Sequence, residues 1–265
     1  MTNDVEALVP GSGCYAALLD HKGKIRADMR VLRGEDWFWL DCEPIGRDPL
    51  AKTIKMYSLG RDVKSEDVTD ARAILSLIGP AAREALDTAP PEDEYAFVEG
   101  EHGLYVATDL GVDIICPAEQ VDATREVLGI EPVSAEAAEC VRIESGRPRH
   151  GVDMGAETIP QEAGLNERAV SFEKGCYVGQ ETVARLHYKG KPNRFLRGLR
   201  LTAEAEPGMP IAFGDKQVGT IGSSCVSPAH GPIALALVRR EAAVGDTVRV
   251  GDGIEAEVIE LPFES

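Results

Sequence analysis

The segment FEKGCYVGQETVARLHYKG, residues 172–190, contains a single cysteine, Cys176, with glycines close on both sides. Glycine lets the backbone turn sharply and approach a ligand where a β-carbon would clash. A helix is predicted to begin at Gln180, and its partial positive N-terminal charge, together with Lys174, would favour thiolate over thiol. Cys176 is therefore a candidate reactive thiol, and the alternative is a small apolar residue packed in a turn.

Tyr177 and Glu181 are the nearby side chains that could assist this thiol, Tyr177 by stacking on a ligand and Glu181 by accepting a hydrogen bond. The alternative for Tyr177 is a core aromatic residue. A metal role for Cys176 is disfavoured because a stable cluster needs several thiolates, and the sequence has no CxxC and no Cys/His cluster. We expect reduced thiols, mostly buried, and no protein-held metal site. The cysteines are Cys14, Cys42, Cys116, Cys140, Cys176 and Cys225.

The charge of the chain is strongly acidic, −17 over 265 residues, but it is unevenly distributed. Residues 171–200 hold seven basic and two acidic side chains, a local charge of +5. The overall acidity argues against general nucleic-acid binding, which needs a broad positive surface. The basic strip 171–200 could hold a polyanion, and the alternative is a solvated face. Because the sequence shows neither a long apolar run nor a signal peptide, we predict a cytoplasmic protein without membrane contact.

Strands and helices alternate over the first 145 residues. Hydrophobic periodicity and turn residues predict strands at 14–20, 25–32 and 37–42, a helix at 47–59, two strands within 62–79, a short helix from Pro80, three strands within 95–117, and helices at 118–128 and 134–145. Two successive strand-and-helix units indicate two similar α+β lobes.

The pattern changes after residue 192, where short alternating stretches are broken by Gly, Pro and Asp. This pattern is typical of a small antiparallel barrel or sandwich. We therefore predict the α+β class. Two α+β lobes with antiparallel sheets, at about 1–92 and 93–191, form one domain, 1–191, and a C-terminal antiparallel β-barrel forms a second domain, 192–265.

The KGCYVGQE motif, followed by VAR and a basic linker into a β-rich tail, resembles the signature of the YgfZ family of folate-binding proteins, which assist iron–sulfur enzyme maturation. That family is similar in fold to the T-protein of the glycine cleavage system, a tetrahydrofolate-dependent aminomethyltransferase. RIESG (142–146), HGVD (150–153) and IPQEAGL (159–165) resemble the RxExG, GxD and PxExxL series of both families. The resemblance extends to the N-terminus, where TNDV begins at residue 2 and a KGK turn follows.

The resemblance implies a reduced folate, tetrahydrofolate, as cofactor. A carboxylate can accept two N–H bonds from a pterin ring while an aromatic ring stacks on its face. Asp109 matches the acid of the T-proteins by position, and Arg142 matches the arginine that receives a folate carboxylate. The alternatives are a turn aspartate bonded to its own backbone and an exposed helix arginine paired with a neighbouring glutamate. Tyr177, Gln180 and Glu181 complete the expected folate-binding set.

The resemblance also bears on catalysis. T-proteins carry two adjacent acids at the start of the second strand of the meander, where this chain has Ala27 and Asp28. Asp28 could face the folate or point to solvent, and the missing neighbour leaves the acidic pair incomplete, so enzymatic activity stays open. The catalytic candidates are Cys176 as reactive group, Lys174 tuning it, and Asp28.

The resemblance implies support of the maturation or repair of iron–sulfur enzymes, by a monomer whose partners are assembly proteins or client enzymes. The alternatives are a true aminomethyltransferase and an adaptor that binds RNA or an acidic partner through the basic strip 171–200. In the family TNDV follows an opening strand and helix. We expect either that this unit is missing, leaving apolar surface uncovered, or that the true start lies upstream.

Overall fold

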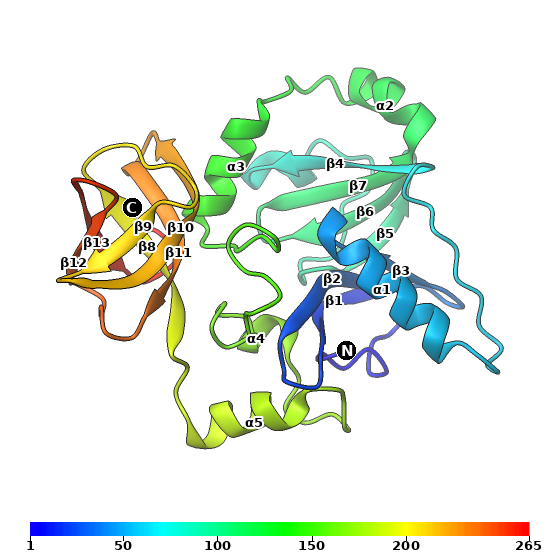
Figure 1. Ribbon diagram of the computed structural model, residues 1–265. Helices are drawn as coiled ribbons and strands as arrows, with labels where there is room; N and C mark the ends of the chain where they lie inside the picture. Colours follow the sequence, from blue (N-terminus) through cyan, green and yellow to red (C-terminus); the bar gives the residue numbers. More distant parts are fainter. Residues whose placement is uncertain (265) are drawn as a thin grey trace.

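The N-terminal sheet is an antiparallel meander with strand order β1-β2-β3 in the computed structural model, which describes residues 1–264 (Figure 1). Its strands are β1 (Ser12–Leu19), β2 (Ile25–Arg33) and β3 (Phe38–Asp41). The predicted helix after the meander is α1 (Pro44–Tyr57), with proline at its first position, where a missing N–H costs no helical bond. The prediction of a meander followed by a helix is confirmed.

A second sheet has strand order β4-β7-β6-β5, with β4 (Arg72–Ile78), β5 (Phe97–Gly100), β6 (Gly103–Thr108) and β7 (Gly111–Pro117). A 3₁₀ turn, η1 (Pro80–Arg83), follows β4. β4 pairs with β7, so this sheet crosses the predicted lobe limit at residue 92. The prediction of two strands within 62–79 is wrong, because residues 62–67 are exposed and offer no face that a sheet could bury.

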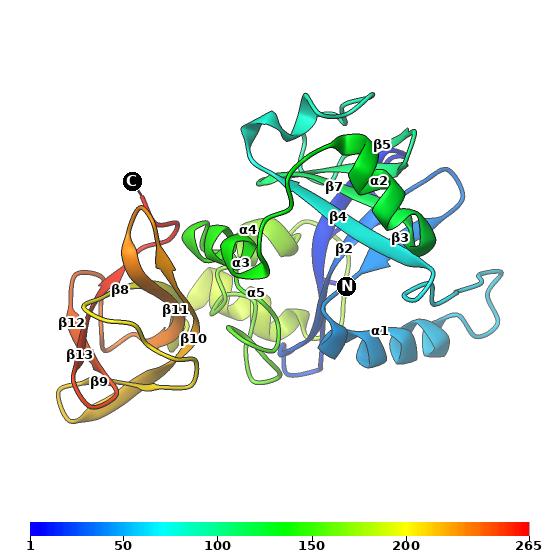
Figure 2. The ribbon, with the colours of Figure 1, turned by 90° about the horizontal axis from the view of Figure 1, so that it is seen from above.

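The two sheets pack against each other through a shared cluster in which Leu32 of β2 packs with Phe97, Val106 and Ile115 of the second sheet. Helical elements then follow in the chain: η2 (Ala118–Gln120), α2 (Val121–Leu128), α3 (Ala135–Glu144), α4 (Asn166–Ala169) and α5 (Gln180–Lys189). Figure 2 shows α3, α4 and α5 between the sheets and the C-terminal barrel. Among residues 1–264, no helix has the length and apolar character needed to cross a membrane.

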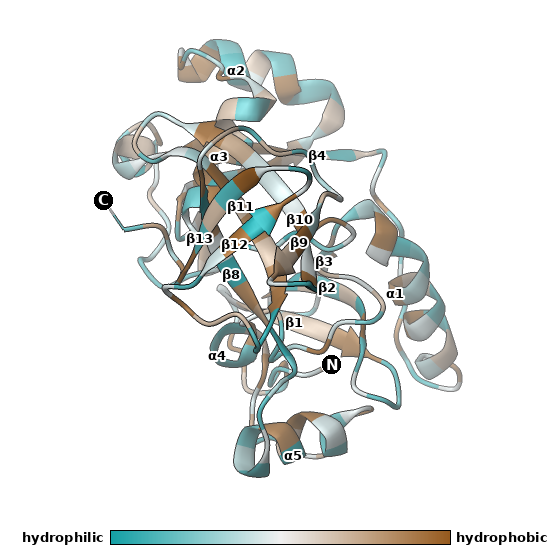
Figure 3. Cartoon of the chain, turned by 60° about the vertical axis from the view of Figure 1, so that its left-hand side comes forward, coloured by the Kyte–Doolittle hydropathy of each residue, from teal (hydrophilic) through white to brown (hydrophobic). Residues whose placement is uncertain are grey.

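The C-terminal strands form a closed antiparallel barrel with order β10-β11-β8-β13-β12-β9, which confirms the predicted α+β class with a β-barrel. The strands are β8 (Arg194–Leu201), β9 (Pro210–Phe213), β10 (Lys216–Ser227), β11 (Gly231–Arg239), β12 (Thr247–Val250) and β13 (Ile254–Ile259). Alternate residues such as Leu199, Ile211 and Val258 fill its interior, and hydrophobic segments run along its strands in Figure 3. α3 packs on the outside of β10 and β11 and joins the barrel to the rest of the molecule.

Candidate functional site

A buried carboxylate, Asp28, lies on β2 and is only 7% exposed. Tyr15 of β1 donates its hydroxyl hydrogen to Asp28 Oδ2, because the β1–β2 register places Ala17 opposite Asp28 and Tyr15 two residues further along the same face. His150 Nδ1 lies 3.5 Å from the other carboxylate oxygen, Oδ1. The alternative that Asp28 points to solvent is therefore wrong.

The polar atoms of this Tyr15–Asp28–His150 centre are incompletely satisfied. Within residues 1–264, neither Asp28 Oδ1 nor His150 Nδ1 has a hydrogen-bond partner of good geometry, although both atoms are buried. Burial and the neighbouring Asp28 charge raise the pKa of Tyr15 well above its ordinary value, which keeps this hydroxyl a donor. Most buried polar groups in folded proteins are hydrogen-bonded, so such a place is a candidate for ligand or proton chemistry.

Arg168 of α4 connects this centre to the surface. Its guanidinium lies over the Tyr15 ring, 5.4 Å from the ring centroid, and Nη2 donates to the Tyr95 hydroxyl at 3.0 Å and pairs with Glu94. Tyr95 is held at a φ of +67°, a strained conformation for a residue with a β-carbon, and burial raises the pKa of its hydroxyl. Arg168 Nε is buried without a partner in the described part of the chain.

Arg168 also lines a cavity of about 300 Å³ at the seam between the barrel and the segments that follow α3 and lead into α4. Two further arginines, Arg147 and Arg197, line this seam cavity, as do residues 163–165 and 260–262. Arg147 Nε donates to Asp109 Oδ2 at 2.6 Å, and Arg197 donates to Glu260 at 2.8 Å. The predicted folate acid, Asp109, thus lies in the β6–β7 turn beside an arginine of the seam cavity. Its carboxylate accepts a hydrogen bond from the Arg147 side chain, whereas the alternative interpretation expected a hydrogen bond from the backbone of its own turn.

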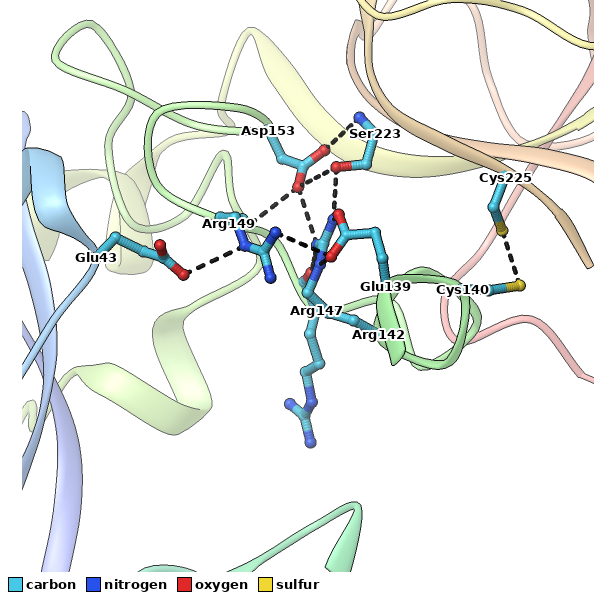
Figure 4. Close-up of polar contacts among 9 residues, drawn as sticks. All are labelled: Glu43, Glu139, Cys140, Arg142, Arg147, Arg149, Asp153, Ser223 and Cys225. Atoms are coloured by element: carbon cyan, nitrogen blue, oxygen red, sulfur yellow. Dashed lines mark hydrogen bonds and ion pairs between the residues drawn. The ribbon is translucent and has the colours of Figure 1, made fainter. Parts of the chain in front are cut away.

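Arg142, the predicted folate arginine, lies on α3 and is fully engaged with the protein (Figure 4). Its Nε and Nη2 donate to Glu139 at 3.0 and 2.6 Å, its Nη1 donates to Asp153 at 3.0 Å and to the Arg147 carbonyl, and Nη2 also donates to Ser223 Oγ at 2.5 Å. A guanidinium has five N–H donors, so none remains for a ligand in this arrangement. The bond from Arg142 holds the pKa of Glu139 below its ordinary value.

Asp153 is the other half of this network, and its side chain is 0% exposed. It accepts hydrogen bonds from Ser223 N at 2.7 Å, Ser223 Oγ at 3.0 Å and Arg149 N at 2.9 Å. Arg149 in turn pairs with Glu139 and, at 3.2 Å, with Glu43, next to α1. The Arg142–Asp153 network therefore joins α3, the segment after it and β10 of the barrel, and its geometry is that of a structural connection.

The KGCYVGQE turn lies at the start of α5, at the lower edge of Figure 1. Cys176 is exposed. The Lys174 ammonium donates to the carbonyls of Asn3 at 2.8 Å and Met1 at 3.2 Å and lies 5.9 Å from the centre of the Tyr177 ring. These bonds direct Lys174 to the N-terminal segment, and its predicted effect on Cys176 stays a prediction.

The remaining members of the predicted folate set surround this turn. Tyr177 packs against the cluster around Val183, and burial raises the pKa of its hydroxyl. Gln180 and Glu181 form the first turn of α5, where Glu181 is exposed. The predicted folate set is thus divided, since Asp109 and Arg142 belong to the β6–β7 turn and to α3, whereas Tyr177, Gln180 and Glu181 lie at or just before the start of α5.

The two glycines of the motif have different roles. Gly179 has a φ of +84°, and a β-carbon there would lie 2.5 Å from the Asp20 carbonyl oxygen and 2.9 Å from Gly23 Cα. It is needed so that the turn can pack on the β1–β2 hairpin. Gly175 faces open space, where an added β-carbon would meet nothing within 4 Å. The sequence predicted a close approach to a ligand, whereas the close approach at Gly179 is to the protein backbone.

The sequence reasoning missed Tyr15, Tyr95, His150 and Arg168. The alternation of β1 could have placed Tyr15 on the face of Asp28, since register fixes which residues share a face. His150 belongs to the HGVD series, but no local pattern indicates that it meets Asp28. Of the described residues, no group of His, Cys, Asp and Glu is arranged to hold a metal ion.

Comparisons with known proteins define the class. Residues 1–112 match the family model described as the GCVT N-terminal domain, and residues 194–264 match the glycine cleavage T-protein C-terminal barrel domain. The crystal structure of glycine cleavage system aminomethyltransferase T from Bartonella henselae superposes with a TM-score of 0.83 at 23% identity, covering 97% of this chain and 77% of that chain. The fold is therefore that of the T-proteins.

Sequence relatives give the family. An aminomethyltransferase of Thermotoga petrophila is 30% identical over 295 residues, which cover 99% of this chain and 79% of that protein. A putative chloroplastic transferase of Arabidopsis thaliana is 28% identical over 282 residues, covering 99% of this chain and 65% of the length of that protein. The chain belongs to the aminomethyltransferase family of the glycine cleavage T-protein.

Proposed function

We propose that this protein binds a reduced folate, tetrahydrofolate or a one-carbon derivative, at the Tyr15–Asp28–His150 centre and the adjoining seam cavity. The observation that carries the proposal is the buried Asp28 carboxylate, whose Oδ1 has no hydrogen-bond partner of good geometry within residues 1–264. A carboxylate of this kind can accept the neighbouring N–H groups of a pterin ring. The family relationship supports the choice of ligand, since relatives carry the name aminomethyltransferase.

The donor set fits the two ends of a folate. At the pterin end, Asp28 supplies an acceptor, and the Tyr15 ring, which Arg168 covers on one face, lies beside it. At the glutamate end, Glu167 and Glu260 also line the seam cavity, and each of its arginines already pairs with one carboxylate of the protein. A guanidinium has five N–H donors, so these arginines keep donors for a carboxylate of the ligand. Bound folate would supply the nitrogen atoms that accept or carry a one-carbon unit. His150 would hold or release a proton beside Asp28, because its Nδ1 faces that carboxylate at 3.5 Å.

Calorimetry with tetrahydrofolate tests this assignment. Asp28→Asn keeps the size of the side chain and removes its charge, so we expect affinity to fall by at least about tenfold, the loss of one charged hydrogen bond. Arg125→Gln on α2 is the matched control, because Arg125 is half exposed and lies outside the centre and the cavity. Absence of binding to well-folded wild type, or equal affinity in Asp28→Asn, would refute the site.

We further infer that the bound folate serves the maturation or repair of iron–sulfur enzymes, with Cys176 as the reactive group. The support is the KGCYVGQE resemblance together with the exposure of Cys176, which leaves its thiol open to a partner. Alanine stands at position 27, where T-proteins have a second acid, and its methyl group contributes no second carboxylate to the site. In cells that lack the protein, Cys176→Ser should fail to restore the activity of an iron–sulfur enzyme, and Cys14→Ser should restore it.

Aminomethyl transfer is the second candidate, favoured by the family relationship. An assay of methylene-tetrahydrofolate formation from an aminomethyl-lipoyl carrier protein decides between the two. Robust turnover that is lost in Asp28→Asn and kept in Cys176→Ser would favour transfer. No turnover, combined with loss of iron–sulfur enzyme activity in Cys176→Ser, would favour the maturation role.

A further inference from the structure

We propose that Cys140 and Cys225 form a dithiol–disulfide site that fastens α3 to the barrel and is oxidised by low-molecular-weight disulfides such as glutathione disulfide. The two residues are 85 positions apart in the sequence. This cysteine pair is separate from the proposed folate site, because neither cysteine belongs to the Tyr15–Asp28–His150 centre or lines the seam cavity.

The geometry brings the sulfurs within reach of a bond. Cys140 lies on α3 and Cys225 on β10, and their Sγ atoms are 3.0 Å apart and face each other in Figure 4. A disulfide bond is about 2.05 Å long, so the sulfurs need to approach by about 1 Å. A small rotation of two side chains supplies such a movement without a change of fold.

The surroundings of the two thiols determine which one an oxidant reaches and how fast both react. Cys140 is 8% exposed and Cys225 is partly exposed, so a small oxidant reaches Cys225 first. Glu144 Oε1 lies 3.7 Å from Cys140 Sγ and accepts a hydrogen bond from Ser227 of β10 at 2.5 Å. Burial, and the nearby charge of Glu144, raise the pKa of both thiols, so both are slow to react at neutral pH and exchange faster at alkaline pH.

The proposed reaction balances with the small disulfide as the oxidant. Cys225 loses its proton to solvent, and its sulfur attacks one sulfur of the small disulfide, breaking that bond and releasing one thiolate. Cys140 then loses its proton and attacks the Cys225 sulfur, forming the Cys140–Cys225 bond and releasing the second thiolate. The protein dithiol is oxidised by two electrons and the small disulfide is reduced to two thiols.

The Cys140–Cys225 bond would link α3 covalently to β10 of the barrel. α3 carries Arg142 and Glu139, and β10 carries Ser223, so the link would close the same interface that the Arg142–Asp153 network holds by polar contacts. Oxidation should therefore slow the local opening of α3 and leave distant helices unaffected.

Peptide mapping of the full chain tests the site. Reduced protein is equilibrated with glutathione disulfide at mildly alkaline pH, remaining thiols are alkylated, and digestion without reductant is followed by mass spectrometry. We expect one linked pair, Cys140 with Cys225, reversed by dithiothreitol. The link should be absent in Cys140→Ala and Cys225→Ala and present in the control Cys42→Ala. Amide exchange of residues 135–144 should slow by about tenfold on oxidation in wild type and in Cys42→Ala, and should not slow in Cys140→Ala or Cys225→Ala.

The opposing outcomes are distinct. If folded wild type ends with glutathione on Cys225 and an alkylated Cys140, the pair does not close and the proposal fails. A link that instead involves Cys176 would refute it equally. If the link forms while α3 exchanges at its original rate, the site is a disulfide that does not fasten the seam, and the structural consequence is overturned.

Discussion

Replacing Arg142 with methionine separates a structural role of this residue from a folate-binding role. Methionine keeps a long apolar side chain and removes every guanidinium hydrogen bond. Arg142 bonds to Glu139, Asp153 and Ser223 of the protein itself, and its side chain is 12% exposed. We therefore expect Arg142→Met to lose stability before folate is added.

The size of the loss follows from what Arg142→Met leaves behind. Removing one partner of a buried ion pair costs ~3–5 kcal/mol because the other charge stays buried. Asp153 keeps three donors, from Arg149 N, Ser223 N and Ser223 Oγ, which places the expected loss near the lower limit. A loss of about 3 kcal/mol reduces the folding equilibrium constant by about 100-fold.

Urea unfolding followed by tryptophan fluorescence and circular dichroism measures this difference for the full chain. Arg125→Met on α2 is the control, since Arg125 is 49% exposed and its ion pair with Asp122 is 3.9 Å long. A surface pair of this kind contributes at most ~1 kcal/mol. The reasoning is refuted if Arg142→Met unfolds within about 1 kcal/mol of wild type. If its tetrahydrofolate affinity also falls by tenfold or more, the predicted folate role of Arg142 stands instead.

Further predictions concern the motif turn and the second sheet. Gly179→Ala should destabilise the protein by ~2 kcal/mol in urea unfolding, because its φ is +84° and a β-carbon would meet the Asp20 carbonyl oxygen, whereas Gly175→Ala should stay within ~0.5 kcal/mol of wild type. Burial and a hydrogen bond to Asp87 raise the pKa of Tyr105 from 10.0 to about 12, so this residue stabilises the fold below pH 10 and loses that effect as the pH rises toward 12. The stability difference between wild type and Tyr105→Phe, measured by urea unfolding, should therefore shrink across that range, and a constant difference would contradict the assignment.

Local patterns predicted most of the fold. The meander and the barrel strands follow from alternation and turn residues, which act within a few residues. The helix predicted at 47–59 from its apolar spacing and Pro49 is α1, which begins earlier, at Pro44, and contains Pro49. Local patterns did not show that one sheet crosses the predicted lobe limit at residue 92. The pairing of β4 with β7 joins segments about 40 residues apart in the sequence, so it leaves no local signal. Two strands were predicted within 62–79, but residues 62–67 are exposed and have no partner surface, and the strand of this segment is β4 (Arg72–Ile78).

The candidate site was predicted less completely because its partners come from distant segments. Asp28 was identified by resemblance, but the approach of His150 depends on how the loop after α3 packs on β2. Arg142 was identified as a ligand residue from its motif, and its engagement by Asp153 and Ser223 depends on the docking of the barrel. Side-chain partners of this kind are set by tertiary packing, which a motif does not contain.

The KGCYVGQE turn and the Asp28 centre are connected through the N-terminal segment. Lys174 donates to the Asn3 carbonyl, and the Asn3 side chain donates to the carbonyls of Tyr15 at 2.8 Å and Arg168 at 3.1 Å. Gly179 packs on the hairpin between β1 and β2, the strands that carry Tyr15 and Asp28. The motif therefore helps to hold β1 and β2, the two strands that carry Tyr15 and the buried Asp28 carboxylate, in position. This arrangement gives the lysine and glycine of the motif a structural reason that holds whatever Cys176 reacts with.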